Sequence, residues 1–328
     1  MEILALFTQN ITSPPILFFV VGVIAGFLKS DLNVPPQISR YFSIYLMMAI
    51  GFKGGVAIAV APEINAQIFW VFFIGILTGF TQPFIGYCLL RLTTKLDSAT
   101  CAAISAHYGS ISMVTFVTAV AFLDFNEVVY AGYIVAVLAL MEAPAILTGL
   151  FIANKTEPKT VNSTNKATTR LMKEIFTNGA ILLLTGSFLI GFLSGQNGMD
   201  KMKGFFVDPF YGFLAFFLLD MGLVVSRQIH HLKEFSFRLF LFGIYMPFMG
   251  FAIGLFASYM IGLDLGTGFL FSMLIASASY IAVTAAMRLA LPEAKAGIYI
   301  PMTLAITFPF NISIGIPLFY SVAKYFLN

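Results

Sequence analysis

Two apolar stretches of the sequence carry clusters of hydroxyl and small residues. The first reads AAISAHYGSISMVTF (residues 102–116) and the second reads SASYIAVTAA (residues 277–286). A helix that breaks inside a membrane leaves backbone groups unpaired, which is tolerated only where they line a cavity or bind a ligand. A half-helix N-terminus suits a small anion, whereas freed carbonyls and hydroxyls suit Na⁺. The residues that would take part are Gly109, Ser110, Ser112, Thr115, Ser277, Ser279 and Thr284. The competing interpretation is that small residues only let helices pack closely.

Two further apolar stretches combine a proline with a polar side chain. Glu142 precedes Pro144 by two residues, and Asn311 follows Pro309 by two. A proline frees a carbonyl within a helix, and a carboxylate inside a membrane marks a functional site by default. We expect Ser110, Ser112, Glu142 and Thr307 to supply Na⁺ ligands, and Asn311 to lie near the anion. The alternative roles of Glu142 are to accept a proton, or to make a structural hydrogen bond that locks helix packing.

Other polar residues in apolar stretches have structural interpretations. Lys53 and Asp220 carry opposite charges in corresponding stretches of the two halves, and we predict that they form a structural ion pair. His107 beside Tyr108 is interpreted as a satisfied core residue, although imidazole titrates near neutral pH.

The elements that position these residues are membrane-spanning helices. Of the 328 residues, 59% are hydrophobic and 10% are charged, and the mean hydropathy is +0.92. Soluble domains carry about 25% charged residues, and a spanning helix needs about 20 apolar residues. The composition therefore predicts an all-α polytopic membrane protein with no nucleic-acid partner. The ten predicted spans are 14–29, 36–54, 68–91, 98–122, 127–153, 178–195, 206–226, 236–261, 265–290 and 296–325.

The distribution of charge predicts the orientation of the chain. The polar stretch 154–177 separates residues 1–153 from residues 178–328, so that each half holds five predicted spans. Placing both termini outside puts most of the 18 Lys and Arg residues, and this linker, on the cytoplasmic side. The positive-inside rule favours that arrangement in the plasma (inner) membrane. No phosphate-binding loop, dinucleotide-binding glycine pattern or metal-protease motif is present, which argues against ATP-driven transport by this chain alone.

The two halves also resemble each other in sequence. When they are superposed, GSISMVTFVTA (109–119) lies on ASYIAVTAAMR (278–288), which pairs Ser110 with Ser279. A half with five spans begins and ends on opposite sides, so the second copy must be inverted. Inverted repeats with matched breaks are typical of secondary transporters.

Four segments resemble the sodium-dependent bicarbonate transporter family. They are SPPILFFVVGVIAG, LMMAIGFKGG, ALMEAPAIL and TFPFNISIGIPLFY, and the last places Phe310 beside Asn311 in the substrate set. The resemblance covers essentially the whole chain. It implies a Na⁺-coupled bicarbonate symporter with ten helices in two inverted five-helix repeats, divided into core and gate domains. It also implies elevator-like movement and a homotrimer in membrane lipid, and it leaves open a PII-like regulatory protein on the cytoplasmic side.

Three other functions remain alternatives. A transporter of the same fold for another small or organic anion, coupled to Na⁺ or H⁺, is the nearest of them. No Arg lies deep in a predicted span to clamp a carboxylate, which favours a small anion. An anion channel would need a continuous polar lining, and an enzyme would need more than His107 and Glu142 on separate spans.

Overall fold

The computed structural model describes residues 2–60, 66–156, 179–230, 232, 235–280, 283, 284, 287, 291 and 293–327. Every regular element in these ranges is helical. The first half contains α1 (Glu2–Ile11), α2 (Pro14–Phe27), α3 (Pro36–Ala59), α4 (Ala66–Thr93), α5 (Ser98–Gly109), α6 (Met113–Phe125) and α7 (Ile134–Thr156). The second contains α9 (Gly179–Phe206), α10 (Phe210–Ile229), α11 (Phe237–Ile261), α12 (Leu265–Ala276), α14 (Ala296–Pro301), η2 (Met302–Thr307), α15 (Phe308–Phe310), η3 (Asn311–Gly315) and α16 (Ile316–Leu327).

Membrane-spanning helices account for most of the chain. Among the described residues, six helices are long and apolar enough to cross a membrane, or seven if α1 and α2 form one bent span. Hydropathy does not predict α1, because its ten residues are too short to cross a bilayer. The predicted span 178–195 continues as α9 past a kink at Gly195, whose φ of 55° lies in the region that favours glycine.

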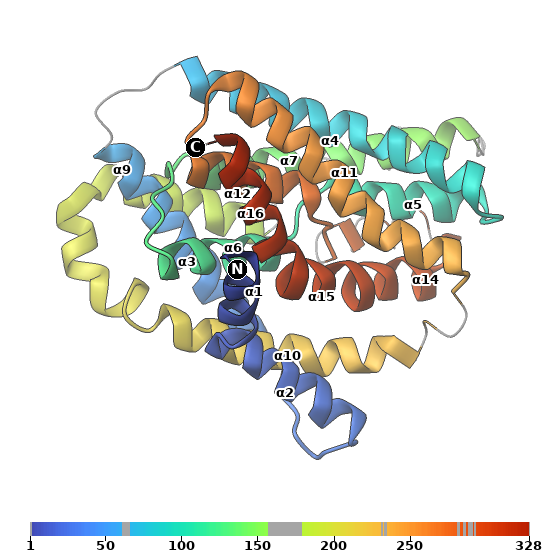
Figure 1. Cartoon of the computed structure of the whole chain (residues 1–328), viewed down its shortest axis with the longest axis horizontal. Helices are drawn as coiled ribbons and strands as arrows, with labels where there is room; N and C mark the ends of the chain where they lie inside the picture. Colours follow the sequence, from blue (N-terminus) through green and yellow to red (C-terminus); the bar gives the residue numbers. More distant parts are fainter. Residues whose placement is uncertain are drawn as a thin grey trace.

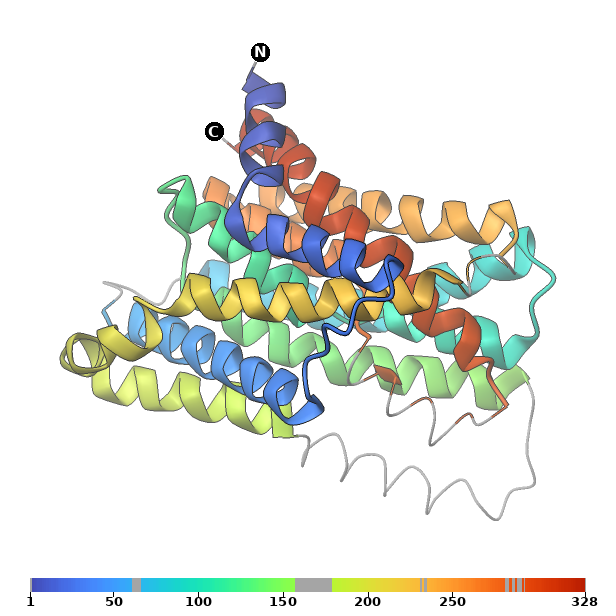
Figure 2. The same ribbon diagram turned by 90° about the horizontal axis from the view of Figure 1, so that it is seen from below.

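Two groups of helices lie side by side in both views of the ribbon. In Figures 1 and 2, α2 runs along α10 and α3 runs along α9. On the other side, α4 packs against α5 and α7, and α11 packs against α12. The two termini meet, since α1 contacts α16 and the Asn10 Nδ2 donates to the Ile312 carbonyl at 2.9 Å.

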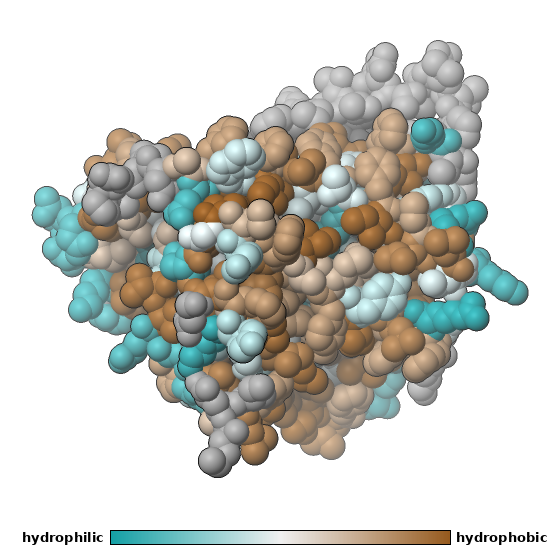
Figure 3. Space-filling model, turned by 45° about the horizontal axis from the view of Figure 1, so that its top comes forward, coloured by the Kyte–Doolittle hydropathy of each residue, from teal (hydrophilic) through white to brown (hydrophobic). Residues whose placement is uncertain are grey.

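The surface fits a bilayer that the helices cross. In Figure 3, hydrophilic residues gather mainly toward the two ends of the long axis, and apolar residues dominate between them. Large apolar side chains such as Phe69, Leu193 and Phe256 are among the most exposed in the chain. In water such a surface would aggregate, whereas in lipid it is the favourable contact.

The predicted ion pair between Lys53 and Asp220 is not the one that forms. The Lys53 Nζ lies 3.0 Å from the Asp124 Oδ2 at the end of α6, and also 5.2 Å from the centre of the Phe210 ring. Asp220 instead accepts a hydrogen bond from the Ser39 hydroxyl, which joins α10 to α3. The prediction was wrong because helix positions in the sequence do not say which neighbouring helix a side chain meets.

A double-mutant cycle tests this correction. We expect Lys53→Gln and Asp124→Asn to show a coupling free energy of about 0.5–1 kcal/mol in unfolding, the size seen for partly exposed pairs. The matched control is the cycle of Lys53→Gln with Asp220→Asn, for which the expected coupling is close to zero. Equal coupling in the two cycles would contradict the arrangement.

Candidate functional site

The first predicted break lies between α5 and α6. Ser110 follows α5 with extended backbone (φ −103°, ψ 171°), and Ser112 is also extended (φ −98°, ψ 111°). Ser112 is the N-cap of α6, because its Oγ accepts from the Thr115 backbone N–H at 3.2 Å. Ser110 and Ser112 are 1% and 2% exposed, so this break in the helix is fully buried. The prediction of a broken span at this position is confirmed.

The second break follows α12 and contacts the first. Ser277 takes extended backbone (φ −91°, ψ 169°), and its Oγ accepts from the Ser112 backbone N–H at 2.8 Å. The Ser279 N–H donates to the His107 carbonyl at 2.9 Å. Each break therefore pairs backbone groups that the other has freed, which is how non-helical backbone survives at membrane depth.

The two broken helices also begin alike. The Asp97 Oδ1 accepts from the Thr100 N–H at 2.7 Å at the start of α5, and the Asp264 Oδ1 accepts from the Thr267 N–H at 2.9 Å at the start of α12. Both helices have 12 residues and end in an extended serine. The helix ends therefore make Ser277 the counterpart of Ser110. The alignment of the two halves pairs Ser110 with Ser279 instead, so the two pairings differ by two residues.

The Asp97 cap makes stability depend on pH. Partial burial opposes the charge, but hydrogen bonds from Thr100 and the charge of Lys295 hold the pKa of the Asp97 carboxyl below its ordinary value of 3.8. Because the folded pKa is the lower one, the stabilisation is complete above the unfolded pKa and is lost as pH falls through the folded pKa. We expect Asp97→Asn, which keeps a capping oxygen, to flatten the fall in unfolding temperature below about pH 4. Parallel curves for the variant and the parent protein, recorded in detergent, would contradict this.

Two amide side chains hold the C-terminal end of α12. The Gln82 Nε2 donates to the Ile275 carbonyl at 3.0 Å, and the Asn311 Nδ2 donates to the Ala276 carbonyl at 3.2 Å. The last carbonyls of a helix lack partners within it, so these amides satisfy them. Gln82 and Asn311 are 2% and 0% exposed. The amide oxygens of both are therefore buried beside the break.

Four buried oxygens around the two breaks have no hydrogen-bond partner. They are Gln82 Oε1, Ser110 Oγ, Thr115 Oγ1 and Asn311 Oδ1. An unsatisfied buried polar atom costs about 1–3 kcal/mol, so a group of them in one region points to a ligand. In broken-helix transporters, Na⁺ is coordinated by neutral oxygen ligands beside a helix C-terminus. The residues present therefore fit a Na⁺ ion.

Sequence reasoning missed Gln82. It lies in α4, whose apolar run predicts only a membrane span. The available signal is an amide side chain directly before Pro83 inside that run. The Pro83 ring also abuts Gly109, where an added Cβ would overlap it, so α4 passes directly against the end of α5.

Several predicted site residues lie in other surroundings. The Thr307 Oγ1 donates to the Gly243 carbonyl at 2.8 Å and lies 2.5 Å from the Tyr108 hydroxyl. The Thr284 Oγ1 donates to the Tyr280 carbonyl at 2.8 Å and lies 3.0 Å from the His107 Nε2. These hydroxyls are engaged within the protein, unlike that of Ser110.

Phe310 and Glu142 complete the predicted set. The Phe310 ring packs against Phe248 at 5.5 Å and Phe319 at 6.3 Å between centroids. The backbone of Glu142 lies in α7, but its side chain falls outside the described part of the structure. The Na⁺ ligand role of Glu142 therefore stays a prediction.

The last span changes its helical pitch beside the site. The π-helical segments η2 and η3 flank Pro309, and Asn311 is the first residue of η3. Proline lacks the N–H of a regular helix, and π-helical turns are frequent at functional sites. The altered pitch sets the position at which Asn311 reaches the end of α12.

His107 is satisfied within the fold. Its Nδ1 lies 2.6 Å from the Ala103 carbonyl, and its ring centroid lies 4.8 Å from that of Tyr299. These contacts agree with the interpretation of His107 as a core residue. In the described ranges, no three or more His, Cys, Asp or Glu side chains gather into a site for a metal ion.

Comparison with known proteins also indicates a transporter. No curated protein matches the chain. The sequence model of the Na⁺-dependent bicarbonate transporter superfamily matches residues 14–324, nearly the whole chain. A match of that extent, over a helical membrane protein with two buried broken helices, shows that the chain belongs to the Na⁺-dependent bicarbonate transporter superfamily.

Proposed function

We propose that this protein is a Na⁺-coupled symporter of bicarbonate. The observation that carries the proposal is the pair of joined helix breaks surrounded by four unpaired buried oxygens. Membership of the superfamily supports bicarbonate as substrate and Na⁺ as the coupling ion. A transporter needs such a site because a permeating ion must replace its hydration shell with protein groups.

The cation and the anion take different groups of the site. The Na⁺ is held by oxygens of Ser110, Gln82 and Asn311 together with carbonyls at the end of α12, and Ser112, Thr307 and Glu142 stay in the candidate set. The anion lies at the N-terminal end of α6, near Ser277 and Ser279, because the N-terminus of a helix suits a small oxyanion. Each ion lowers the electrostatic cost of binding the other, which couples their movement.

The proposed architecture is a pair of inverted repeats, residues 1–153 and 178–328, joined by a cytoplasmic linker at 154–177. The matched caps of α5 and α12 and their extended terminal serines support it. In this proposal the pairs α2 with α10 and α3 with α9 form the gate, and the elements that hold the breaks move past it as an elevator. The proposal includes both termini outside and a homotrimer.

Uptake into proteoliposomes tests the function. Labelled bicarbonate at fixed pH is supplied with an inward Na⁺ gradient, and separately with K⁺ replacing Na⁺. We expect uptake that requires Na⁺ and saturates with its concentration. Bicarbonate entry that ignores Na⁺ would favour a channel. If bicarbonate does not enter, it is not the substrate, and the next uptake assay tests organic acids with Na⁺ or H⁺ as the coupling ion.

A charge-neutral substitution tests Glu142 as a Na⁺ ligand. We expect Glu142→Gln to weaken the Na⁺ dependence of uptake while the protein still folds, because the amide keeps the size but loses the charge that attracts the cation. Glu127→Gln, in the exposed loop after α6, is the matched control and should leave uptake unchanged. Unchanged Na⁺ activation in the Glu142 variant would remove this residue from the site.

A further inference from the structure

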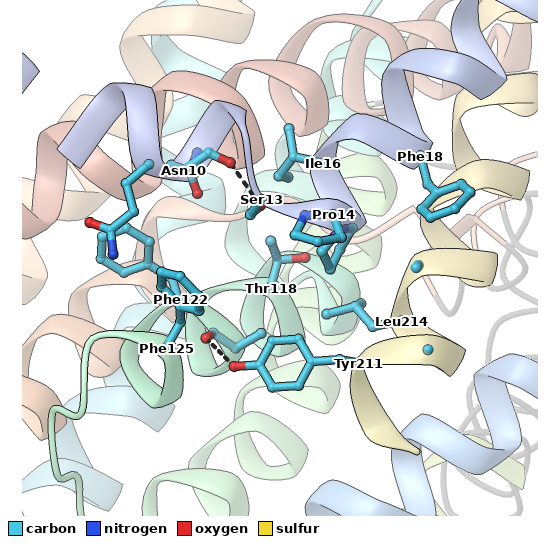
Figure 4. Close-up of a pocket in the computed structure, with 15 residues that line it drawn as sticks. Asn10, Ser13, Pro14, Ile16, Phe18, Thr118, Phe122, Phe125, Tyr211 and Leu214 are labelled. Carbon is cyan, nitrogen blue, oxygen red and sulfur yellow. Dashed lines mark hydrogen bonds between the residues drawn. The ribbon is translucent and has the colours of Figure 1, made fainter. Parts of the chain in front are cut away.

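An apolar cavity lies at the elbow between α1 and α2, away from the helix breaks. Its volume is about 420 Å³, and its walls come from the elbow, the second half of α6 and the start of α10 (Figure 4). The chain bends by 62° between the two helices of the elbow. A volume of this size lies within the range of small-molecule sites, about 300–1,000 Å³.

Most of the polar side chains around the cavity are already paired with the protein. The Ser13 hydroxyl donates to the Asn10 carbonyl at 2.7 Å, and the Tyr211 hydroxyl donates to the Ala121 carbonyl at 2.7 Å (Figure 4). The Asn10 Nδ2 donates to two carbonyls of η3, those of Ile312 and Ser313. None of the 15 lining residues is charged. The lining therefore favours an apolar occupant.

The rim of the cavity continues into the lipid-facing surface. Phe18 and Phe125 stand at the rim with 47% and 57% of their surface exposed. On α2 the exposed apolar side chains continue with Val21 and Ile24, which are 50% and 51% exposed. In a membrane such a band is in contact with lipid acyl chains, so the cavity opens to the hydrocarbon interior of the bilayer.

We propose that this cavity binds one acyl chain of a membrane lipid. The absence of charge in its lining, the internal pairing of most of its polar side chains and its continuity with the exposed apolar band all fit a hydrocarbon chain. The bound chain lies between α10 and α6, the helix whose first residues adjoin the break. It therefore occupies a boundary across which the proposed transport movement takes place, although binding itself does not depend on which ion is carried.

Fluorescence quenching tests this proposal. Phe122, which is 6% exposed and lines the cavity, becomes a reporter through Phe122→Trp in a Trp70→Phe background, since Trp70 is the only tryptophan. The protein is reconstituted in phosphatidylcholine with brominated acyl chains and, separately, in the unbrominated lipid. We expect the introduced tryptophan to lose most of its emission in the brominated lipid. Emission that is equal in both lipids would overturn the proposal.

A cavity-filling substitution provides the control for location. Gly212 lines the cavity on α10, and an added Cβ there meets no atom within 4 Å, so Gly212→Leu fills the space without a backbone clash. We expect it to restore emission of the reporter. Gly204→Leu on α9, also in open space, should leave quenching unchanged.

A second, smaller cavity-filling substitution keeps the test valid if Gly212→Leu fails to fold. Ala215→Val acts one turn further along α10 and should restore emission in part. If the reporter is still fully quenched in both folded variants, Gly212→Leu and Ala215→Val, the bromine reaches it from outside the cavity, and the proposal is overturned.

Discussion

Replacing Asn311 by alanine is expected to lower Na⁺-driven uptake about 10- to 100-fold. The change removes the donor to the Ala276 carbonyl, which is buried at the end of α12, and deletes an unpaired oxygen of the proposed Na⁺ site. Leaving a buried carbonyl unsatisfied costs about 1–3 kcal/mol, and each 1.4 kcal/mol is a factor of ten. The measurement is the initial rate of bicarbonate uptake against Na⁺ concentration, in which we expect half-saturation to shift upward.

Asn126→Ala is the matched control for this prediction. The Asn126 Nδ2 also donates to a backbone carbonyl, that of Phe122 at 2.8 Å, but it does so at the end of α6 remote from the break. The same substitution therefore removes the same kind of hydrogen bond without touching the site. If the two variants transport equally at every Na⁺ concentration, the role of Asn311 is refuted.

Gly222→Ala is expected to lower the free energy of unfolding by about 1–3 kcal/mol. Gly222 on α10 lies directly against α2, where an added Cβ would overlap the Phe19 carbonyl and come within 2.8 Å of the Val23 nitrogen. Gly22 on α2 faces it, and its added Cβ would lie 3.1 Å from the Gly222 Cα. Glycines of this kind let two helix backbones approach closely in a membrane. A methyl group must push them apart, and overpacking has costs of this size.

Thermal unfolding in detergent measures this effect. Gly212→Ala is the control on the same helix, because its added Cβ meets nothing within 4 Å. Alanine is the better helix former by up to about 1 kcal/mol, so the control should be neutral or slightly stabilising. Equal unfolding temperatures for Gly212→Ala and Gly222→Ala would contradict close backbone contact between α2 and α10.

Local sequence patterns predicted the class of protein and the places where helices break. The apolar composition leaves no soluble alternative, because burying so many apolar residues requires a bilayer around the protein. The clusters near Ser112 and Ser277 predicted the breaks, since small hydroxyl residues compete for backbone hydrogen bonds and cap helices. The resemblance of four segments predicted the superfamily.

The partners of these residues were decided only by the tertiary structure. Gln82 reaches a carbonyl 193 positions away, and Lys53 meets Asp124 in place of Asp220. An apolar run shows that a helix lies in the membrane, but in lipid its polar side chains can face any neighbouring helix. The neighbour is selected by close packing at points such as Gly22 with Gly222, which depends on all the helices together. The sequence by itself therefore determined the membrane class and where the spans break, whereas the packing of the helices determined which oxygens are left unpaired at those breaks.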